Sequence, residues 1–561
     1  MSVKQKAGLG TTLIFGALLA LMAFAFAPLR VHGAPGVDPV GFALEMRTAF
    51  RDIPHSRPWH ITDVERSLRP AVYLGGGSFL SFEPAMDRAV GGTLRFPGDL
   101  EISAHLVHSD PQLGLSLTRI DKQGDEADGW RAPPTTVFAE SLDLRGRGAA
   151  LHLVGYGKNR AGGLRRHTVF LEGMRSGALA AVAGIAGRSL PLMQFSGWTP
   201  GIHPGDLLFV DRGGRPQLAG IVVRIHENDR LGFALPAPLL AGYVKLALAR
   251  SAQQNTSKSN RPGGPEHDSF LPGVAQLSVI SDPGFRAEPI GNRAARAYYG
   301  LKPGSEGALL VSRVMPYSNA LRDRVQAGDV IVGVNGESLG PGGTIVDGRY
   351  GPLDLQALLG FRNGRPLAAG ASVRLDLIRK RERRSVRLEL HPHRAEYVRV
   401  PEYFERPAYL IAGGLVLVEL SERYLNEKAS GAGAEDSSLA PRLKFLARAR
   451  RLLDRPEKSR YVILDRILPV PFNAAYRRVA ADHPLLLLSL NGVAVRDLAH
   501  LNQMMQEHLT AGRDLALGLE DGRLIVLPGA DRGSALKQAD ADVRARHGIP
   551  FLQGNLDPIR K

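Results

Sequence analysis

The first half of the chain contains serine, histidine and aspartate side chains of the kinds that carry out nucleophilic acyl transfer. This chemistry needs a hydroxyl nucleophile, a histidine that takes its proton, a carboxylate that holds the histidine's tautomer, and backbone donors for the oxyanion. Ser196 and His203, in the stretch "SGWTPGIHPGD", are the obvious candidates. Neither lies in a nucleophile elbow or beside an oxyanion turn, so we expect no working catalytic site from them.

Two further histidines, His105 and His108, lie close together in a segment that is expected to be extended. Their spacing places the two rings on opposite faces of a strand, so we do not expect them to share a metal ion. The chain has no cysteine, which excludes disulfides, thiolate metal sites and thiol nucleophiles. Asp206 is expected to be an ordinary turn residue. We therefore predict neither a metal site nor a cofactor.

Residues 34–250, which carry these side chains, are predicted to form a mainly β domain. Short apolar runs alternate with glycine-rich turns, as in a barrel or a sandwich; they occupy residues 71–74, 151–154, 207–210 and 218–223. Residues 239–249, "LLAGYVKLALA", are apolar around most of a helical circumference. This stretch is expected to form a terminal helix that packs on the β domain.

Three stretches of this domain resemble the trypsin-like domain of Deg/HtrA serine proteases, namely "LEISAHLVHSDPQLGLSLTRID", "LHLVGYG" and "PGIHPGDLLFVDRGGRPQLAGIVVRIHENDRLGFALPAPLL". The resemblance implies a trypsin-like double β-barrel. Where the family has its carboxylate this chain has Gly114, and where the family has its nucleophile turn it has Gly205-Asp206-Leu207. The family's histidine is expected within residues 84–90, but no histidine lies between His60 and His105. We therefore predict the fold with no catalytic residues.

A polar linker at residues 251–267 leads to a domain that is expected at 268–392. Residues 299–339 predict a strand, a short helix, a Gly-Asp pair, a second strand and the turn pair Asn335-Gly336, which accepts the positive φ of tight hairpins. This order resembles the PDZ domains of Deg/HtrA proteases, which bind a peptide as an added strand beside a helix. "SVRLDLIRKRERRSVRLEL" predicts a closing hairpin with a charged tip at 379–384.

By resemblance, one wall of the peptide groove is a strand that begins at Leu277, Ser278, Val279 and Ile280, and the other is a helix at 352–361. The family has a glycine where this chain has Ser278, which puts capture of a peptide's terminal carboxylate in doubt. The helix would present three leucines to the peptide: Leu355, Leu358 and Leu359. The same leucines suit a hydrophobic core equally well, so both interpretations stay open.

The stretch "RPAYLIAGGLVLVELSERYL" resembles the divergent second PDZ domain of a subgroup of Deg proteases, and the residues after it continue the resemblance to about 529. A second PDZ-like domain is therefore expected at 401–529. Asn491-Gly492 repeats the turn pair of the first domain. A loop is expected at 428–440 and a C-terminal tail at 530–561. The predicted fold class is mainly β, a double β-barrel followed by two PDZ-like α+β domains.

At the N-terminus, Lys4 and Lys6 precede an uncharged apolar run at residues 7–29, so residues 1–33 suit either a signal peptide or a membrane anchor. We expect a periplasmic protein, soluble after cleavage or anchored in the inner membrane. The formal net charge is +16, and we interpret most of the arginines as solvated faces and hairpin tips. An anionic membrane surface is the alternative partner. Nucleic acid is not expected, because aromatic stacking platforms are not evident.

Together these features predict a catalytically inactive Deg/HtrA-like protein of the bacterial envelope, a pseudoprotease. It would bind peptides, unfolded proteins or envelope partners through the PDZ groove, as a scaffold, a regulator or a chaperone-like factor. Members of the family form trimers or larger assemblies, which implies a homo-oligomer. Two alternatives stay open, an active serine endopeptidase in protein quality control and a basic structural protein of the membrane surface.

Overall fold

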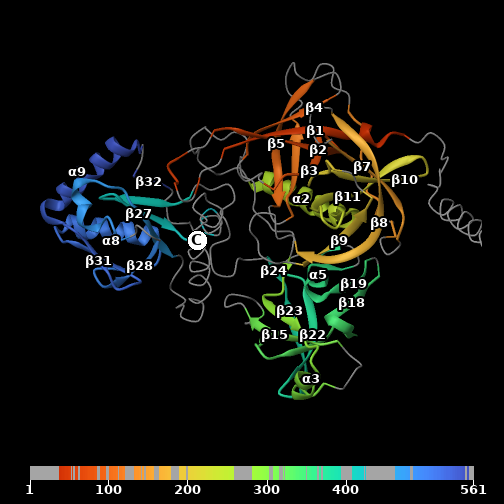
Figure 1. Cartoon of the computed structure of the whole chain (residues 1–561). Helices are drawn as coiled ribbons and strands as arrows, with labels where there is room; N and C mark the ends of the chain where they lie inside the picture. The colour runs from red at the N-terminus through yellow and green to blue at the C-terminus, as the bar shows by residue number, and fades with distance from the viewer. Residues whose placement is uncertain are drawn as a thin grey trace, which may run out of the picture.

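Strands dominate the described part of the chain and helices are few, as the predicted fold class requires (Figure 1). The computed structural model describes residues 37–554 with gaps, of which the longest are 121–131, 179–188, 258–280, 393–406 and 428–460. The predicted leader at 1–33 and the predicted loop at 428–440 lie outside the described residues. No helix that the structure describes is long and apolar enough to cross a membrane.

The first six strands form a closed barrel in the order β1-β2-β3-β6-β5-β4, entered through the 3₁₀ turn η1 (Pro39–Phe42). The strands are β1 (Ala43–Phe50), β2 (Glu65–Gly75), β3 (Ser78–Phe82), β4 (Ala89–Arg95), β5 (Glu101–Asp110) and β6 (Leu115–Ile120). Along β5, buried residues alternate with more exposed ones, so Ile102, Ala104 and Leu106 face the interior. This alternation is typical of a strand with one buried face.

The next six strands close a second barrel in the order β10-β11-β12-β9-β8-β7, which confirms the predicted double barrel. They are β7 (Ala150–Tyr156), β8 (Leu164–Ala178), β9 (Ser189–Ser196), β10 (Leu207–Arg212), β11 (Arg215–His226) and β12 (Leu231–Pro236). The short apolar runs recognised in the sequence lie within β2, β7, β10 and β11.

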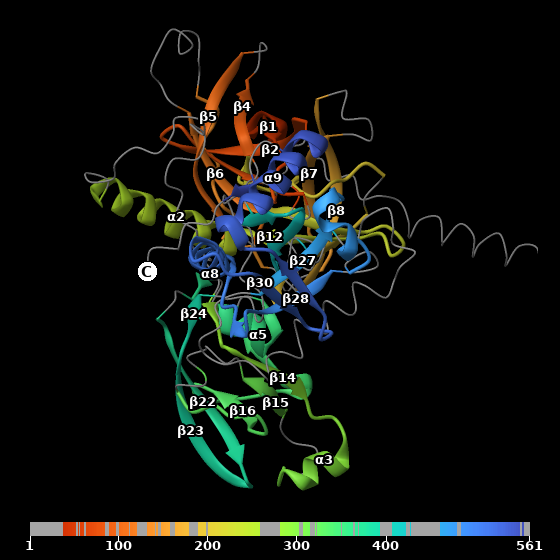
Figure 2. The same ribbon diagram turned by 90° about the vertical axis from the view of Figure 1, so that its left-hand side faces the viewer.

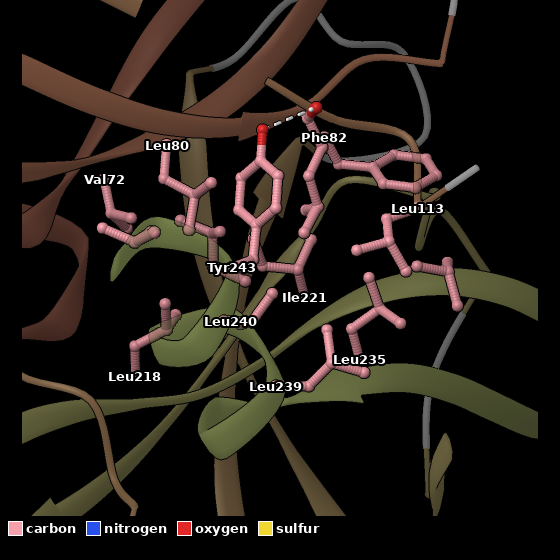
Figure 3. Packing of buried hydrophobic residues seen from close by; sticks show 14 of the residues in the cluster. Val72, Leu80, Phe82, Leu113, Leu218, Ile221, Leu235, Leu239, Leu240 and Tyr243 are labelled. Atoms are coloured by element: carbon pink, nitrogen blue, oxygen red, sulfur yellow. Dashed lines mark hydrogen bonds between the residues drawn. The ribbon is translucent and has the colours of Figure 1, made fainter. Parts of the chain in front are cut away.

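Helix α2 (Ala237–Ser257) follows the second barrel and packs on the β domain, as the apolar stretch predicts. Leu239, Leu240 and Tyr243 belong to a core cluster that takes residues from both barrels (Figure 3). The Tyr243 hydroxyl donates to the Leu115 carbonyl oxygen at 3.2 Å and lies 3.0 Å from Nδ1 of His108. The helix runs further than expected, because the first seven residues of the predicted linker, 251–257, continue it without a glycine or proline.

The first PDZ-like domain is built on a sheet in the order β14-β15-β16-β22-β23, with β17 paired to β16. Its strands are β13 (Ser281–Asp282), β14 (Phe285–Pro289), β15 (Leu309–Val314), β16 (Val330–Val334), β17 (Glu337–Ser338), β18 (Thr344–Asp347), β19 (Gly351–Asp354), β20 (Phe361–Arg362), β21 (Arg365–Pro366), β22 (Ser372–Arg379), β23 (Glu382–Glu389) and β24 (His391–Pro392). The helical segments are α3 (Arg293–Tyr298), η5 (Pro341–Gly343) and α5 (Leu355–Gly360).

Helix α5 is shorter than the helix expected at 352–361. Residues 351–354 pair with β18 as an extended strand instead. The Asp354 carboxylate accepts a hydrogen bond from the Ala357 N–H at 2.7 Å, as an N-cap residue does, and so starts the helix at Leu355.

The second PDZ-like domain has the strand order β31-β30-β28-β27-β26-β25-β32, with β29 paired to β28. Its elements are β25 (Tyr409–Ala412), β26 (Leu415–Glu419), β27 (Val462–Ile467), η7 (Pro471–Tyr476), β28 (Leu485–Leu490), β29 (Val493–Ala494), α8 (Leu498–Thr510), β30 (Leu515–Leu519), β31 (Leu524–Leu527), α9 (Ala530–His547) and β32 (Gln553–Gly554). The predicted tail therefore contributes a helix and a strand that pairs with β25.

The two PDZ-like domains repeat the same turn in the same place. Asn335-Gly336 joins β16 to β17 and Asn491-Gly492 joins β28 to β29, and both asparagines have positive φ. The Asn335 side-chain oxygen accepts from the Arg374 N–H at 2.9 Å, and the Asn491 side-chain oxygen accepts from the Ala516 N–H at 2.6 Å. The turns and their partner strands correspond in the two domains. In chain order, β14, β15, β16, β17, β22 and β23 of the first domain therefore match β26, β27, β28, β29, β30 and β31 of the second, which leaves out the small pairs β18–β21.

The first PDZ-like domain packs directly on the second barrel. Tyr350, Leu353 and Ala357 are buried in the same hydrophobic cluster as Leu151 and Phe195 of that barrel. Figure 1 shows α5 and β19 at this junction, below β9. The hairpin β18–β19 and the helix after it therefore connect the two domains.

Candidate functional site

The positions that would carry a catalytic triad come together around Phe82. A Cβ atom built on Gly114 would lie 2.5 Å from Cε2 of the Phe82 ring, and one on Gly205 would lie 3.6 Å from the Phe82 carbonyl oxygen. The Glu83 N–H donates to the Gly114 carbonyl oxygen at 2.7 Å, and Pro84 follows at the start of the range where the family has its histidine. Three places far apart in the sequence, which the resemblance assigns to the triad, thus lie close together.

The Phe82 ring and the ion pair between Arg69 and Glu83 occupy the space around these positions. Phe82 is buried, and the Arg69 guanidinium donates to the Pro204 carbonyl oxygen at 2.6 Å, beside Gly205. Nε of Arg69 also lies 3.7 Å from the carboxylate of Glu83, whose side chain is 3% exposed. A buried carboxylate is costly unless a cation accompanies it, so Arg69 stabilises Glu83 while joining the two barrels.

Asp206 and Leu207, which align with the family's nucleophile turn, stabilise the fold through a hydrogen bond and through core packing. The buried Asp206 carboxylate accepts from the His203 N–H at 2.9 Å, which closes the turn between these residues. It also packs on Gly155, where a Cβ would lie 2.2 Å from the carboxyl carbon. Leu207 begins β10 and is buried in the core. The expectation of a turn residue at Asp206 is consistent with this geometry.

The other candidate side chains are held apart by their own contacts. The Ser196 hydroxyl donates to the Glu172 carboxylate, and the His108 ring contacts the Tyr243 hydroxyl. His108 is buried and His105 is half-buried, as expected for opposite faces of β5. Within the described residues, no group of three or more histidine, aspartate or glutamate side chains could hold a metal ion.

The residues assigned to the peptide groove fall into two groups. Leu277, Ser278, Val279 and Ile280 lie outside the described residues. Leu355 and Leu359 are 2% and 1% exposed and belong to the core of the first PDZ-like domain. Leu358 lies between them in α5. The peptide-binding role of all these residues stays a prediction, while the core interpretation accounts for the burial of two of them.

The edge strand β14 is a feature that the sequence analysis missed. In the part of the sheet that the structure describes, β14 pairs only with β15. The Ile290 N–H donates to the Ala308 carbonyl oxygen at 3.0 Å, in register with the β14–β15 ladder. Because backbone groups alternate along an antiparallel pair, the N–H and C=O of Ala287 point away from β15. The next outward position is Pro289, which has no N–H to donate. Because proline within a sheet is confined to edge strands, this residue could have indicated an edge strand from the sequence.

The corresponding edge of the second PDZ-like domain is covered by the chain itself. Strand β26 corresponds to β14, and β25 pairs along it from Ala412–Leu415 to Tyr409–Val418. Leu410 and Ala412 of β25 share a core cluster with Leu501 and Met505 of α8. This edge of the second domain is thus paired within the chain, whereas among the described residues of the first domain β14 pairs with β15 alone.

A carboxylate from the predicted tail holds the turn between β25 and β26. The Gly413 N–H donates to the Asp540 carboxylate at 2.6 Å, and Asn473 Nδ2 donates to the Gly413 carbonyl oxygen at 2.8 Å. Burial raises the pKa of Asp540 to about 6, against the opposing effect of the hydrogen bond from Gly413. The sequence analysis missed Asp540 because it assigned α9 to a separate tail.

Comparison with known proteins supports the C-terminal half of this architecture directly. Residues 398–553 match the PDZ domain family, a span that includes α9 and ends at the first residue of β32, beyond the predicted boundary at 529. "Protease Do-like 2, chloroplastic" of Arabidopsis thaliana is 27% identical over 369 residues, which are 64% of this chain and 52% of the relative. The chain thus spans about half the length of that relative. These matches support homology with the HtrA/Deg proteases.

Solved structures were also matched, at TM-scores below 0.5. "HtrA-type protease AlgW with decapeptide" has a TM-score of 0.41 at 17% identity, over 64% of this chain and 97% of that one. "Crystal structure of the serine endoprotease from Yersinia pestis" has a TM-score of 0.35 at 14% identity, over 64% of this chain and 100% of that one.

The packing of Phe82 can be tested at Gly114. Gly114→Ala is expected to lower the free energy of unfolding of the barrels by about 3 kcal/mol, because the backbone has a φ of +69° and the new methyl group would meet the ring. Gly76→Ala is the matched control, with a φ of +58° and no atom within 4 Å, and should cost only about 1 kcal/mol. Urea unfolding followed by circular dichroism measures both. Equal losses would contradict the steric role of Phe82.

The contact between Asp540 and Gly413 predicts a dependence of stability on pH. The folded pKa of about 6 lies above the ordinary value of 3.8, so the contribution to stability is fully present below pH 3.8 and is lost as the pH rises through 6. The difference corresponds to about 3 kcal/mol. Asp540→Asn keeps the acceptor oxygen and removes the charge, so the variant should exceed the wild type in stability at pH 7.5 and approach it at pH 4.5. Parallel stability curves in urea would rule this out.

Proposed function

We propose that this chain is a catalytically inactive Deg/HtrA-like protein of the bacterial envelope, which binds extended peptides or partner proteins as a scaffold, a regulator or a chaperone-like factor. The observation that carries the proposal is the set of residues at the triad positions. Gly114 and Gly205-Asp206-Leu207 supply neither a hydroxyl nor a catalytic carboxylate there, and residues 84–90 supply no imidazole. Hydrolysis by the trypsin mechanism needs all three groups in mutual contact.

The local packing supports the loss of catalysis beyond the substitutions themselves. A side chain at position 114 would collide with Phe82, and Leu207, at the position of the family's nucleophile, is buried in the core. The space that a triad would need therefore contains the packed side chains that join the barrels. Reinstating single residues would leave those side chains in the way.

Peptide binding is proposed for the first PDZ-like domain. Strand addition needs an edge whose backbone N–H and C=O groups point outward, and Ala287 of β14 provides such a pair. In the second domain, β25 pairs along the matching strand β26. We therefore assign recognition to the first domain and a structural role to the second.

An active serine endopeptidase is the second candidate function. The name of the relative "Protease Do-like 2, chloroplastic" favours it, and the hydrogen bond from Ser196 to Glu172 gives one serine a carboxylate partner. This alternative needs a base that takes the Ser196 proton in an open cleft.

Periplasmic location and a trimeric assembly belong to the proposal of an inactive protein as well. The location rests on Lys4, Lys6 and the apolar run at 7–29.

A fluorophosphonate probe distinguishes the two functions. The full chain is expected to remain unlabelled while circular dichroism shows a folded protein, because labelling needs an activated serine. Trypsin provides the positive control for the reagent. Labelling that disappears in Ser196→Ala, or in a variant of any other serine, would establish the endopeptidase and end the proposal of inactivity.

Peptide binding can be tested at the outward edge of β14. With the full chain and a library of extended fluorescent peptides, Ala287→Pro is expected to weaken binding about ten-fold, because it removes one outward N–H donor. Its β15 ladder stays intact, since the ladder uses the neighbouring residues. Ala287→Val keeps the N–H and should bind like the wild type. If no peptide binds, or if both variants bind equally well, this edge does not receive peptides.

A further inference from the structure

We propose that the free end of the first PDZ-like domain is a binding surface for anionic lipid headgroups. This surface, called here the basic tip, lies where β22 turns into β23 beside the end of α3. It consists of Tyr298, Arg324, Lys380, Arg381, Arg383 and Arg384. Figures 1 and 2 show this end of the domain pointing away from the two barrels. The inference is independent of peptide binding and of catalysis.

The backbone of the tip keeps its cations in an unfavourable conformation. Lys380 and Arg381 form the two-residue turn and have φ values of +51° and +69°. Glycine and asparagine adopt this conformation with least strain, and the chain uses Asn335-Gly336 and Asn491-Gly492 in two other hairpins of the same kind. A lysine and an arginine give the turn no conformational advantage. Their presence points to a role for the charges themselves.

One arginine anchors the tip and leaves the others at the surface. Nε and Nη2 of Arg379 bind the buried Asp329 carboxylate at 2.6 and 2.8 Å. Nη2 also donates to the carbonyl oxygen of Arg324 at 2.7 Å, which ties that residue to the base of the hairpin. Arg379 is thus neutralised, while the side chains of Arg324, Lys380 and Arg381 remain exposed.

Cations exceed acids at the surface of the tip. Arg384 pairs with Glu382 at 2.9 Å, and Glu382 is the one acid among residues 379–384. A cavity of about 400 Å³ lies beside the hairpin, but it is lined by Glu337 and Asp376 as well as by Arg383 and Arg384. Its acids balance its arginines, so the excess positive charge belongs to the outer turn and not to the cavity.

An exposed aromatic ring accompanies these cations. Tyr298 is 70% exposed at the end of α3, although its ring contacts Tyr299 edge-on at 5.1 Å. Nε of Arg381 donates to the Tyr298 carbonyl oxygen at 3.2 Å, so the ring and the turn are held next to each other. Tyrosine beside arginine and lysine is typical of groups that lie in the headgroup layer of a membrane.

The shape of the tip favours a lipid surface over other anions. A turn that projects from its domain can bring the exposed Lys380 and Arg381 onto a flat bilayer together, whereas an acidic peptide is bound best in a groove or along a strand edge. Single-stranded nucleic acid needs several exposed stacking rings, and of the adjoining pair Tyr298 and Tyr299 the second is partly buried in the domain core. Each surface cation near an anionic bilayer is worth about a five-fold gain in affinity.

The test uses the full chain and sedimentation with vesicles of phosphatidylcholine, with or without phosphatidylglycerol. The double variant Lys380→Asn/Arg381→Gly restores a favoured turn sequence and removes two charges, so it should fold and bind anionic vesicles about 25-fold more weakly. Arg230→Gly is the matched control, since Arg230 is also an exposed arginine with positive φ but lies in the second barrel. It should bind like the wild type. All three proteins share the apolar N-terminus, so their difference reports on the tip.

Several outcomes would overturn the proposal. Equal binding of the double variant and the wild type would remove the tip from any membrane contact, and an equal loss in Arg230→Gly would reduce the effect to net charge. Wild-type binding that ignores phosphatidylglycerol or added salt would exclude headgroup recognition. If polyglutamate or an oligonucleotide binds through Lys380 and Arg381 while vesicles do not, the surface serves a different partner.

Discussion

The first domain depends on the space between two glycines that the ring of Phe82 occupies. Gly114 and Gly205 both have positive φ, and each leaves room on one side of that residue. On the far side, Arg69 crosses from the first barrel to the Pro204 carbonyl oxygen and accompanies the buried Glu83. The two barrels therefore meet through packed side chains at the positions that the sequence resemblance assigns to the triad.

The two PDZ-like domains share a strand order but differ in the strand pairing at one edge of the sheet. Their shared turns, Asn335-Gly336 and Asn491-Gly492, set the same geometry at the centre of each sheet. The difference arises outside that centre, where β25 and β32 extend the second sheet and Asp540 holds the turn at Gly413. An edge that pairs within the chain is protected from other strands, whereas β14 has one unpaired side in the part of the sheet that the structure describes.

Much of this architecture could be predicted from the sequence, because it follows from local patterns. Apolar runs of strand length, the Asn-Gly pairs and the alternating hairpin around residues 379–384 each indicate their own structure. The rest depends on contacts between distant residues: Gly413 and Asp540 are 127 positions apart, and Arg69 and Pro204 are 135 apart. The length of α5 was also missed, because Asp354 caps the helix and pairing with β18 competes for the residues before it. Local propensity cannot reveal such competition.

The burial of α5 bears on how the first PDZ-like domain could recognise a ligand. Leu355 and Leu359 pack into the domain core, while Ala357, on another face of the same short helix, is buried against the second barrel. The side chains of this short helix that the structure describes, those of residues 355, 357 and 359, are thus all committed to packing. Recognition would then rest on the backbone groups of β14, which are the same for every residue type. Binding of that kind discriminates weakly between sequences and suits a protein whose ligands are extended or unfolded segments.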